Sequence, residues 1–189
     1  MSHKLLYLLV LVPLILGVVM AKRAKAVPAL GDSENTLFLD LKDNCRVTIG
    51  LRPDLAPKTV ARIKELSQQG FYNGVVFHRV IDGFMAQTGD PTGTGMGGSG
   101  KKLPDEFPTS ENAYSRGVVA MANAGPGTSD SQFFIMFQDY PLPPQYTVFG
   151  KVTKGMECID KIKKGDKYNN GAVSDPDKIV KMQVATDAK

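Results

Sequence analysis

The chain of 189 residues lacks tryptophan and contains only two histidines and two cysteines. His3 lies at the extreme N-terminus, so His78 is the only imidazole within the rest of the chain. A Ser-His or Cys-His nucleophile would have to use His78, which lies in an apolar run where a hydrogen-bonded structural role is expected. One histidine and two distant cysteines also make a poor metal site. Hydrolase and metalloenzyme functions are therefore disfavoured.

The cysteines, Cys45 and Cys158, are too few for a disulfide framework and are not spaced as zinc ligands. They could pair in an oxidising compartment. The sequence alone favours the other interpretation, in which each is a small hydrophobic core residue without a covalent partner.

An excess of positive charge is also missing once the N-terminus is set aside. Residues 1–26 contain Lys4, Lys22, Arg23 and Lys25 and no acidic residue. The remainder carries 19 Lys and Arg, four fewer than the 23 of the whole chain, against 19 Asp and Glu. A basic face for nucleic acid is therefore not expected, and the formal charge of +4 belongs to the leader.

The leader itself has the pattern of an export segment. Lys4 precedes an apolar run over residues 5–21, and Ala24-Lys25-Ala26 places small residues at the spacing of a signal-peptidase site. An uncleaved membrane anchor over residues 5–21 is the alternative, because this run is near the lower length limit for a span. We expect a signal peptide or anchor at 1–26, a linker at 27–33 and one domain at 34–189. The expected location is outside the cytoplasm, in a bacterial periplasm, with membrane contact only through the leader.

From residue 35 onward, short strands outnumber helices. Alternating apolar residues over 37–51 predict a hairpin, and β-like runs follow at 75–81, 117–122, 132–137, 146–152 and 179–186. Helices are predicted from Pro57 to Gly70 and over 156–164. This pattern favours an antiparallel barrel or sandwich.

Glycine is concentrated in one loop, residues 89–100, which holds six of them. The loop lacks the Gly-Lys-Ser/Thr ending of a phosphate-binding loop and no helix follows it. We therefore interpret it as a tight surface loop that needs positive φ.

Two segments carry the chemistry: FHRVIDGFMAQTGD at 77–90 and GVVAMANAGPGTSDSQFFIMF at 117–137. With TVFGKV at 147–152, they resemble the cyclophilins, and the similarity extends in order over about residues 34–186. The compact loop at 89–98 is similar to bacterial single-domain members. The resemblance implies a closed eight-stranded antiparallel β-barrel capped by two α-helices. It also implies a monomeric peptidyl-prolyl cis-trans isomerase that acts on proline-containing peptides and extended protein segments without a metal or cofactor.

The resemblance also implies roles for individual residues. Arg79 matches the catalytic arginine of the family, and His78 matches a structural histidine beside it. The residues expected in catalysis are Arg79, Phe84, Gln87, Asn123 and Phe134, and those expected in substrate binding are Met85, Ala122, Gln132, Leu142 and Tyr146.

The segment 139–146 departs from the family pattern. Many cyclophilins have a tryptophan before the leucine that matches Leu142, but Pro141 stands here, and Tyr146 replaces a pocket histidine. Weak binding of cyclosporin is therefore expected. Two other functions remain open: a non-catalytic chaperone that binds prolyl peptides, and a small-molecule carrier of the lipocalin type.

Overall fold

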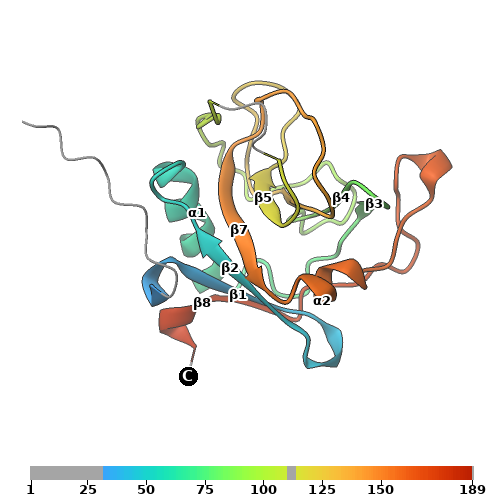
Figure 1. Ribbon diagram of the computed structural model, residues 1–189, viewed down its shortest axis with the longest axis horizontal. Helices are drawn as coiled ribbons and strands as arrows, with labels where there is room; N and C mark the ends of the chain where they lie inside the picture. Colours follow the sequence, from blue (N-terminus) through green and yellow to red (C-terminus); the bar gives the residue numbers. More distant parts are fainter. Residues whose placement is uncertain (1–31, 110–113, 189) are drawn as a thin grey trace, which may run out of the picture.

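A computed structural model describes residues 32–109 and 114–188, which form one strongly curled antiparallel sheet with two α-helices (Figure 1). The sheet has eight strands in the order β3-β4-β6-β5-β7-β2-β1-β8. The helices are α1 (Pro57–Gln68) and α2 (Met156–Asp160). The strands are β1 (Thr36–Asp40), β2 (Arg46–Leu51), β3 (Arg79–Ile81), β4 (Met85–Thr88), β5 (Val118–Met121), β6 (Phe133–Met136), β7 (Val148–Lys154) and β8 (Lys181–Val184).

The sheet is open, so the prediction of a closed barrel is wrong. β3 and β8 are its two edges and do not pair with each other. The segments that precede them are joined by an isolated bridge, Val76 to Lys178, and by a few backbone hydrogen bonds, such as that from the N–H of Phe77 to the carbonyl of Asp177. Two features before β8 prevent a regular ladder: Asp175 has φ 51° and Pro176 has no backbone N–H to donate. The result is a half-barrel.

The main core lies inside this curled sheet, and α1 covers part of it. β1 and β2 form the predicted hairpin, with alternate residues such as Leu37 and Ile49 fully buried. Pro57 opens α1, and Ile63 and Leu66 lie on its buried face. The second helix ends at Asp160 and not at 164, because the N–H of Lys163 donates to the Asp177 carboxylate and leaves the helical pattern.

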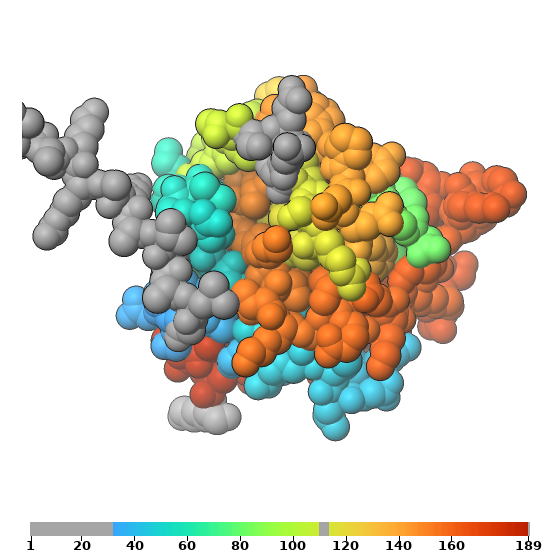
Figure 2. All heavy atoms as spheres, in the orientation of Figure 1, coloured from blue at the N-terminus to red at the C-terminus, as the bar shows by residue number. Residues whose placement is uncertain are grey.

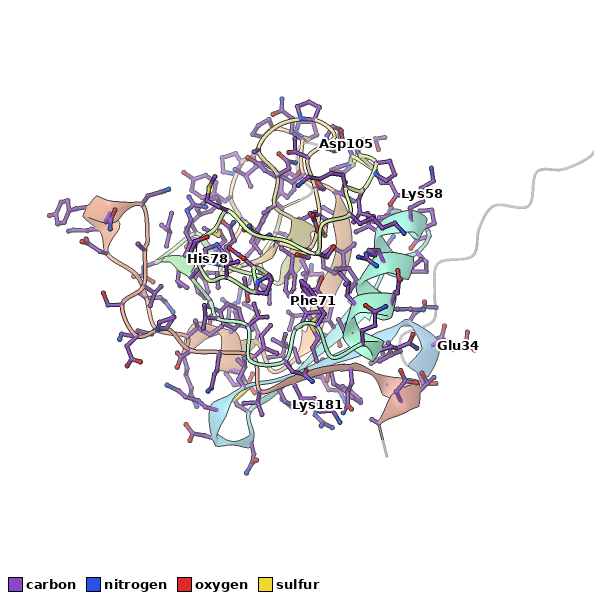
Figure 3. All side chains as sticks on the ribbon, turned by 180° about the vertical axis from the view of Figure 1, so that it is seen from behind. Glu34, Lys58, Phe71, His78, Asp105 and Lys181 are labelled. Atoms are coloured by element: carbon purple, nitrogen blue, oxygen red, sulfur yellow. A yellow bond between two sulfur atoms is a disulfide. The ribbon has the colours of Figure 1, made fainter. Side chains whose placement is uncertain are left out.

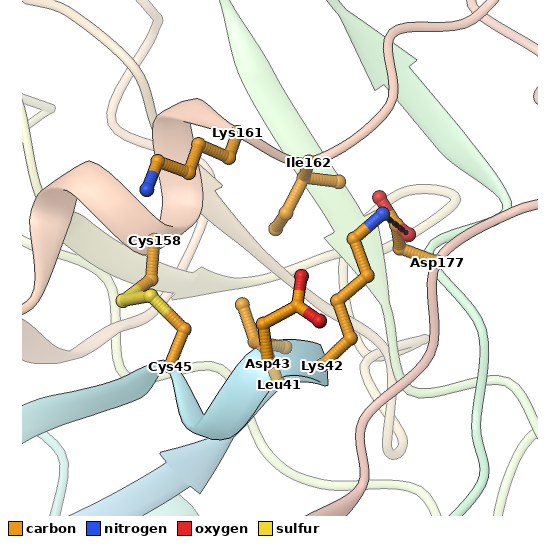
Figure 4. A pocket seen from close by; sticks show the side chains of 8 residues that line it. All are labelled: Leu41, Lys42, Asp43, Cys45, Cys158, Lys161, Ile162 and Asp177. Carbon is orange, nitrogen blue, oxygen red and sulfur yellow. Dashed lines mark ion pairs between the residues drawn. A yellow bond between two sulfur atoms is a disulfide. The ribbon is translucent and has the colours of Figure 1, made fainter.

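The cysteines are paired, so the expectation of two unpaired core residues is wrong. Cys45 follows the β1–β2 turn and Cys158 lies on α2, with 5.8 Å between their Cα atoms (Figure 4). Their position at the core was correctly expected, since Cys158 is buried in the main core and the partly buried Cys45 packs against it. The pairing escaped prediction because 113 residues separate the two positions in sequence.

The neighbouring strands β4, β5 and β6 carry apolar side chains on both faces. Ala86, Val119 and Ile135 belong to the main core. The residues next to them along each strand belong to a second, smaller cluster on the other face of the sheet. This cluster includes Met85, Ala120, Phe134 and Met136. Successive side chains of a strand point to opposite faces, so this second cluster lies outside the half-barrel.

Candidate active site

Four residues face one another across four neighbouring strands. Arg79 on β3 pairs with Gln87 on β4, Gln87 pairs with Phe134 on β6, and Phe134 pairs with Ala120 on β5. Directly opposed residues have their side chains on the same face of a sheet. The register therefore aligns a guanidinium, an amide and an aromatic ring in one row on the outer face.

The second cluster gathers apolar side chains around this row. Phe134 and Met85 are buried in it, and the half-buried residues Phe84, Ala122, Leu142 and Tyr146 pack against them. The rings of Phe134 and Tyr146 meet edge to face, with their centroids 5.5 Å apart. The structure thus brings together all six apolar and aromatic residues that the sequence predicted.

Two tyrosines at this cluster were not predicted. Tyr140 stacks against Phe84 with ring centroids 4.6 Å apart, and it is 44% exposed. The buried Tyr114 donates its hydroxyl hydrogen to the carbonyl of Tyr146 and accepts from the N–H of the same residue, both at 3.0 Å. The aromatic residues that flank the proline-rich segment were the only signal of these contacts in the sequence.

The polar residues form a directed chain of hydrogen bonds. Arg79 Nη1 donates to Gln87 Oε1 at 3.0 Å, and Gln87 Nε2 donates to Gln132 Oε1 at 2.9 Å. Gln132 Nε2 then donates to the carbonyls of Gly95 and Gly97 in the glycine-rich loop, at 2.8 and 2.9 Å. Because those loop carbonyls can only accept, the chain fixes the orientation of both amides and turns Gln87 Oε1 toward the guanidinium.

A buried carboxylate shapes the loop that ends this chain. Asp90 accepts from the N–H groups of Thr92, Gly95 and Gly97 and from the Thr92 hydroxyl. Burial acts to raise the pKa of Asp90, but these hydrogen bonds outweigh it and hold the pKa at about 2. The prediction of a tight loop is confirmed, with φ positive at Gly89, Gly93, Gly95 and Gly100.

A cavity of about 200 Å³ lies beside Gln87, between this loop and the chain after β5. Asn123 lines it, donating its side-chain amide to the carbonyl of Gln145 at 2.8 Å. The cavity is also lined by Gly95, Met96, Gly97, Lys102, Ala122, Ala124, Thr128, Asp130 and Gln132. The structure therefore brings Asn123 and Gln132 to the same cavity as Gln87.

Arg79 lies in surroundings that hold it without neutralising it. Its guanidinium also donates to Asn170, through Nε to the backbone carbonyl at 3.1 Å and through Nη2 to Oδ1 at 3.0 Å. Within the described part of the chain, no carboxylate forms an ion pair with it. Partial burial lowers the pKa of Arg79 and Tyr146 opposes this, but an arginine stays protonated at neutral pH. Asn170 was not predicted, because 91 residues separate it from Arg79.

His78 is not the hydrogen-bonded residue that we expected. Neither ring nitrogen has a hydrogen-bond partner among the described residues. Burial lowers the pKa of His78, with Asp90 opposing, so the ring is neutral at pH 7. Figure 3 shows it across the molecule from Lys58 of α1. His78 can therefore still have a structural role, but packing and not hydrogen bonding would hold its ring in place.

The described ranges 32–109 and 114–188 contain no group of three or more His, Cys, Asp and Glu residues able to hold a metal ion. Over the same residues, no helix has the length and apolar character to cross a bilayer. The predicted leader at 1–26 and most of the linker at 27–33 lie outside the described residues.

Comparisons with known proteins agree with this geometry. Residues 38–184 match the family model of the cyclophilin type peptidyl-prolyl cis-trans isomerases. A probable peptidyl-prolyl cis-trans isomerase of Brucella suis is 53% identical, over 84% of this chain and 86% of that protein. The rat peptidyl-prolyl cis-trans isomerase-like 3 is 49% identical over 68% of this chain and 81% of its own.

Among solved structures, a cyclophilin type isomerase of Cryptosporidium parvum is 31% identical, with a TM-score of 0.71 over 79% of this chain and 96% of its own. The same type of isomerase from that organism was also solved in the presence of the dipeptide Ala-Pro, at 30% identity and TM-score 0.70, over 79% and 98% of the two chains. The fold excludes the lipocalin alternative. The chain belongs to the cyclophilin-type peptidyl-prolyl cis-trans isomerases.

Proposed function

We propose that this isomerase acts on X-Pro bonds of exported proteins, with Arg79 as the group that stabilises the twisted bond. The observation that carries the proposal is the cross-strand row in which Arg79, Gln87 and Phe134 share one face of the sheet. A cation, a hydrogen-bonding amide and an apolar ring are thereby presented together to one peptide.

The chemistry requires only that the twisted bond be favoured over the two planar forms. Resonance in the peptide C–N bond produces a rotation barrier of about 18–20 kcal/mol. The cis and trans forms of X-Pro differ by only about 0.5–1 kcal/mol, so no energy source is needed. In the twisted state the prolyl nitrogen becomes pyramidal and gains a lone pair. A guanidinium directed at this lone pair stabilises it and lowers the barrier.

The other residues of the site hold the two sides of the rotating bond. The apolar pocket of Phe84, Met85, Phe134 and Leu142 receives the proline ring, with Tyr146 at its edge. Gln87, Ala122, Asn123 and Gln132 offer polar and backbone groups to the peptide on the other side. Rotation then takes place between two held segments, without a covalent intermediate.

The proline-peptide partner is supported by the relative solved in the presence of Ala-Pro. By its fold and apolar pocket, the present chain offers a place for the same ring. A site that recognises a proline and the residues next to it does not select one protein. We therefore propose that its substrates are unfolded or extended segments of many proteins.

An exported location is supported by two independent features. The leader has a basic start, an apolar run and small residues at a cleavage spacing. Cys45 and Cys158 form a disulfide, and disulfides persist in oxidising compartments such as the bacterial periplasm. N-terminal sequencing of the mature protein from a periplasmic extract tests this; an N-terminus at Met1 or Ser2 in the soluble cytoplasmic fraction would contradict it.

The catalytic proposal is tested by a protease-coupled assay on an Ala-Pro peptide, with the wild type and Arg79→Ala. We expect the variant to lose about 100-fold or more in kcat/KM, as for the loss of one strong electrostatic donor. Arg79→Lys keeps a charge but not the planar fork, and we expect an intermediate loss. Wild-type protein that binds the peptide without accelerating isomerisation would favour the non-catalytic chaperone.

A further inference from the structure

The loop over residues 165–173 lies against the edge strand β3, next to Arg79, and is joined to it by backbone hydrogen bonds. The N–H of Val80 donates to the carbonyl of Gly171 at 2.8 Å, and the N–H of Gly165 donates to the carbonyl of Val80 at 2.9 Å. Val173 donates to the carbonyl of His78 at 3.2 Å. In Figure 2 the projecting orange-red loop lies directly beside the green segment that follows β3.

Two glycines make this close contact possible. A Cβ at Gly165 would lie 1.9 Å from the carbonyl oxygen of Gly171, and a Cβ at Gly171 would lie 2.5 Å from Ile81 Cγ1. Gly171 also has φ +76°, which favours glycine. Such distances leave no room for another residue type, so the loop is fixed in position against the strand of the arginine.

Asn170 lies at the point where this loop meets the guanidinium. Its backbone has φ 50° and ψ 31°, a left-handed conformation that asparagine tolerates better than most residues. This turn directs both its carbonyl oxygen and its side-chain Oδ1 at Arg79, where they accept from Nε and Nη2. A guanidinium has five N–H donors. Gln87 and Asn170 engage all three nitrogens and leave one N–H on Nη1 and one on Nη2.

Both partners of Arg79 are neutral amides or carbonyls. A carboxylate in the place of Asn170 would orient the guanidinium equally well but would offset its charge, and that charge is what a developing lone pair needs. A guanidinium with only Gln87 as a partner would keep its charge but could rotate about its long side chain. Neutral acceptors on two sides provide orientation without neutralisation.

We propose that Asn170 is a positioning residue for Arg79, holding the guanidinium plane in its catalytic direction without reducing its charge. The inference rests on the proposed role of Arg79. It assigns to the loop over 165–173 a part in turnover that is separate from substrate binding, because Asn170 acts through the arginine.

The test uses Asn170→Gly in the full mature protein, since glycine keeps the positive φ and the backbone carbonyl and removes only the amide. We expect kcat on the Ala-Pro peptide to fall about tenfold, the effect of one hydrogen bond, with KM within about twofold of wild type. Tyr168→Ala is the matched control: Tyr168 lies in the same loop and is 87% exposed, so its removal leaves both constants unchanged. Equal thermal midpoints establish that all variants fold.

Two further variants separate positioning from other effects. In an Arg79→Ala background, assayed at raised enzyme concentration, Asn170→Gly should cause no further loss. Asn170→Asp keeps the acceptor atoms but adds a charge, and we expect its kcat to fall as well.

The inference would be overturned if the kcat of Asn170→Gly equalled that of the wild type, or if the same tenfold loss occurred in the absence of Arg79. A fully active Asn170→Asp would overturn the requirement for neutrality. An unaffected Arg79→Ala would instead refute the proposed function itself.

Discussion

Two single residues of the candidate site, Pro141 and Tyr146, bear on which ligands we expect it to bind. Pro141 is exposed and has neither an indole N–H nor a backbone N–H to donate, and Tyr146 stands where many cyclophilins have a histidine. A cyclosporin molecule bound here would therefore lack a hydrogen bond that those proteins supply, whereas Arg79 and Phe134, which we propose for catalysis, are present.

We accordingly expect weak cyclosporin binding and full isomerase activity in the same preparation. Titration calorimetry with cyclosporin measures the affinity, and the protease-coupled assay confirms that the protein is active. Introducing the missing donor with Pro141→Trp should strengthen binding about tenfold, the worth of one hydrogen bond. A dissociation constant in the low nanomolar range for the wild type would contradict this expectation.

Residue identity indicated apolar residues that do come together in one cluster, but it did not predict the second partner of the arginine. Phe84, Met85 and Phe134 were named through an ordered motif. Alternation along β4 and β6 places Met85 and Phe134 on one face, and Phe84 packs against them from the turn before β4. Asn170 is in no motif. Its position beside Arg79 follows from loop geometry, and the only local sign in the sequence was an Asn-Gly pair, which is common in turns.

Among the elements, the glycine-rich loop depends most on one buried group. The carboxylate of Asp90 is fully buried and collects the N–H groups of Thr92, Gly95 and Gly97. Because the pKa of Asp90 is depressed to about 2 in the folded protein, its contribution to stability is present above the ordinary pKa of 3.8. That contribution is lost as the pH falls from about 4 toward 2.

We expect Asp90→Asn to lower the free energy of unfolding by roughly 2 kcal/mol at pH 7, from a pKa displacement of nearly two units. Urea unfolding of the variant and the wild type at several pH values checks this. The difference should shrink as the pH is lowered from 4 to 2, whereas Asp82→Asn, at an exposed position, should resemble the wild type at pH 7. A difference that stays constant with pH would exclude the carboxylate as its origin.

The sequence predicted most elements but not all of their limits. Runs with strong alternation or continuous burial, such as β1, β2, β5 and β6, were placed correctly within a few residues. β4 was not recognised as a strand by its pattern, because Met85, Ala86 and Thr88 are all buried and give no alternation. The end of α2 was misplaced because a distant carboxylate, Asp177, captures the N–H of Lys163.

At the scale of the whole molecule, the half-barrel leaves two sheet edges, and a segment distant in sequence covers one of them. The loop over 165–173 covers β3 by backbone hydrogen bonds, and β8 is the other edge. These contacts join parts of the chain that are far apart in sequence, which is why strand patterns alone suggested a barrel or sandwich without showing whether it closes.

The Cys45–Cys158 disulfide is the longest covalent constraint in the described chain, and its effect should be on stability rather than on turnover. It joins residues 113 positions apart, so it removes much of the conformational freedom of the unfolded chain. The bond lies against the main core, beside a cavity lined by Leu41, Ile162 and Asp177 (Figure 4), whereas the residues proposed to receive proline belong to the other cluster. No residue of the candidate site lines that cavity.

We therefore expect reduction to lower the free energy of unfolding by about 2–4 kcal/mol. Activity of the folded protein at 25 °C should stay within about twofold. Denaturant titrations with and without a thiol reductant measure the free energy of unfolding. The protease-coupled assay under the same conditions measures the isomerase activity. A Cys45→Ser, Cys158→Ser double variant serves as control. Its free energy of unfolding should equal that of the reduced wild type and should not change when the reductant is added. If reduction left the unfolding midpoint unchanged, the bond would contribute nothing to stability; a large loss of turnover in fully folded protein would show instead that the two clusters are coupled across the sheet.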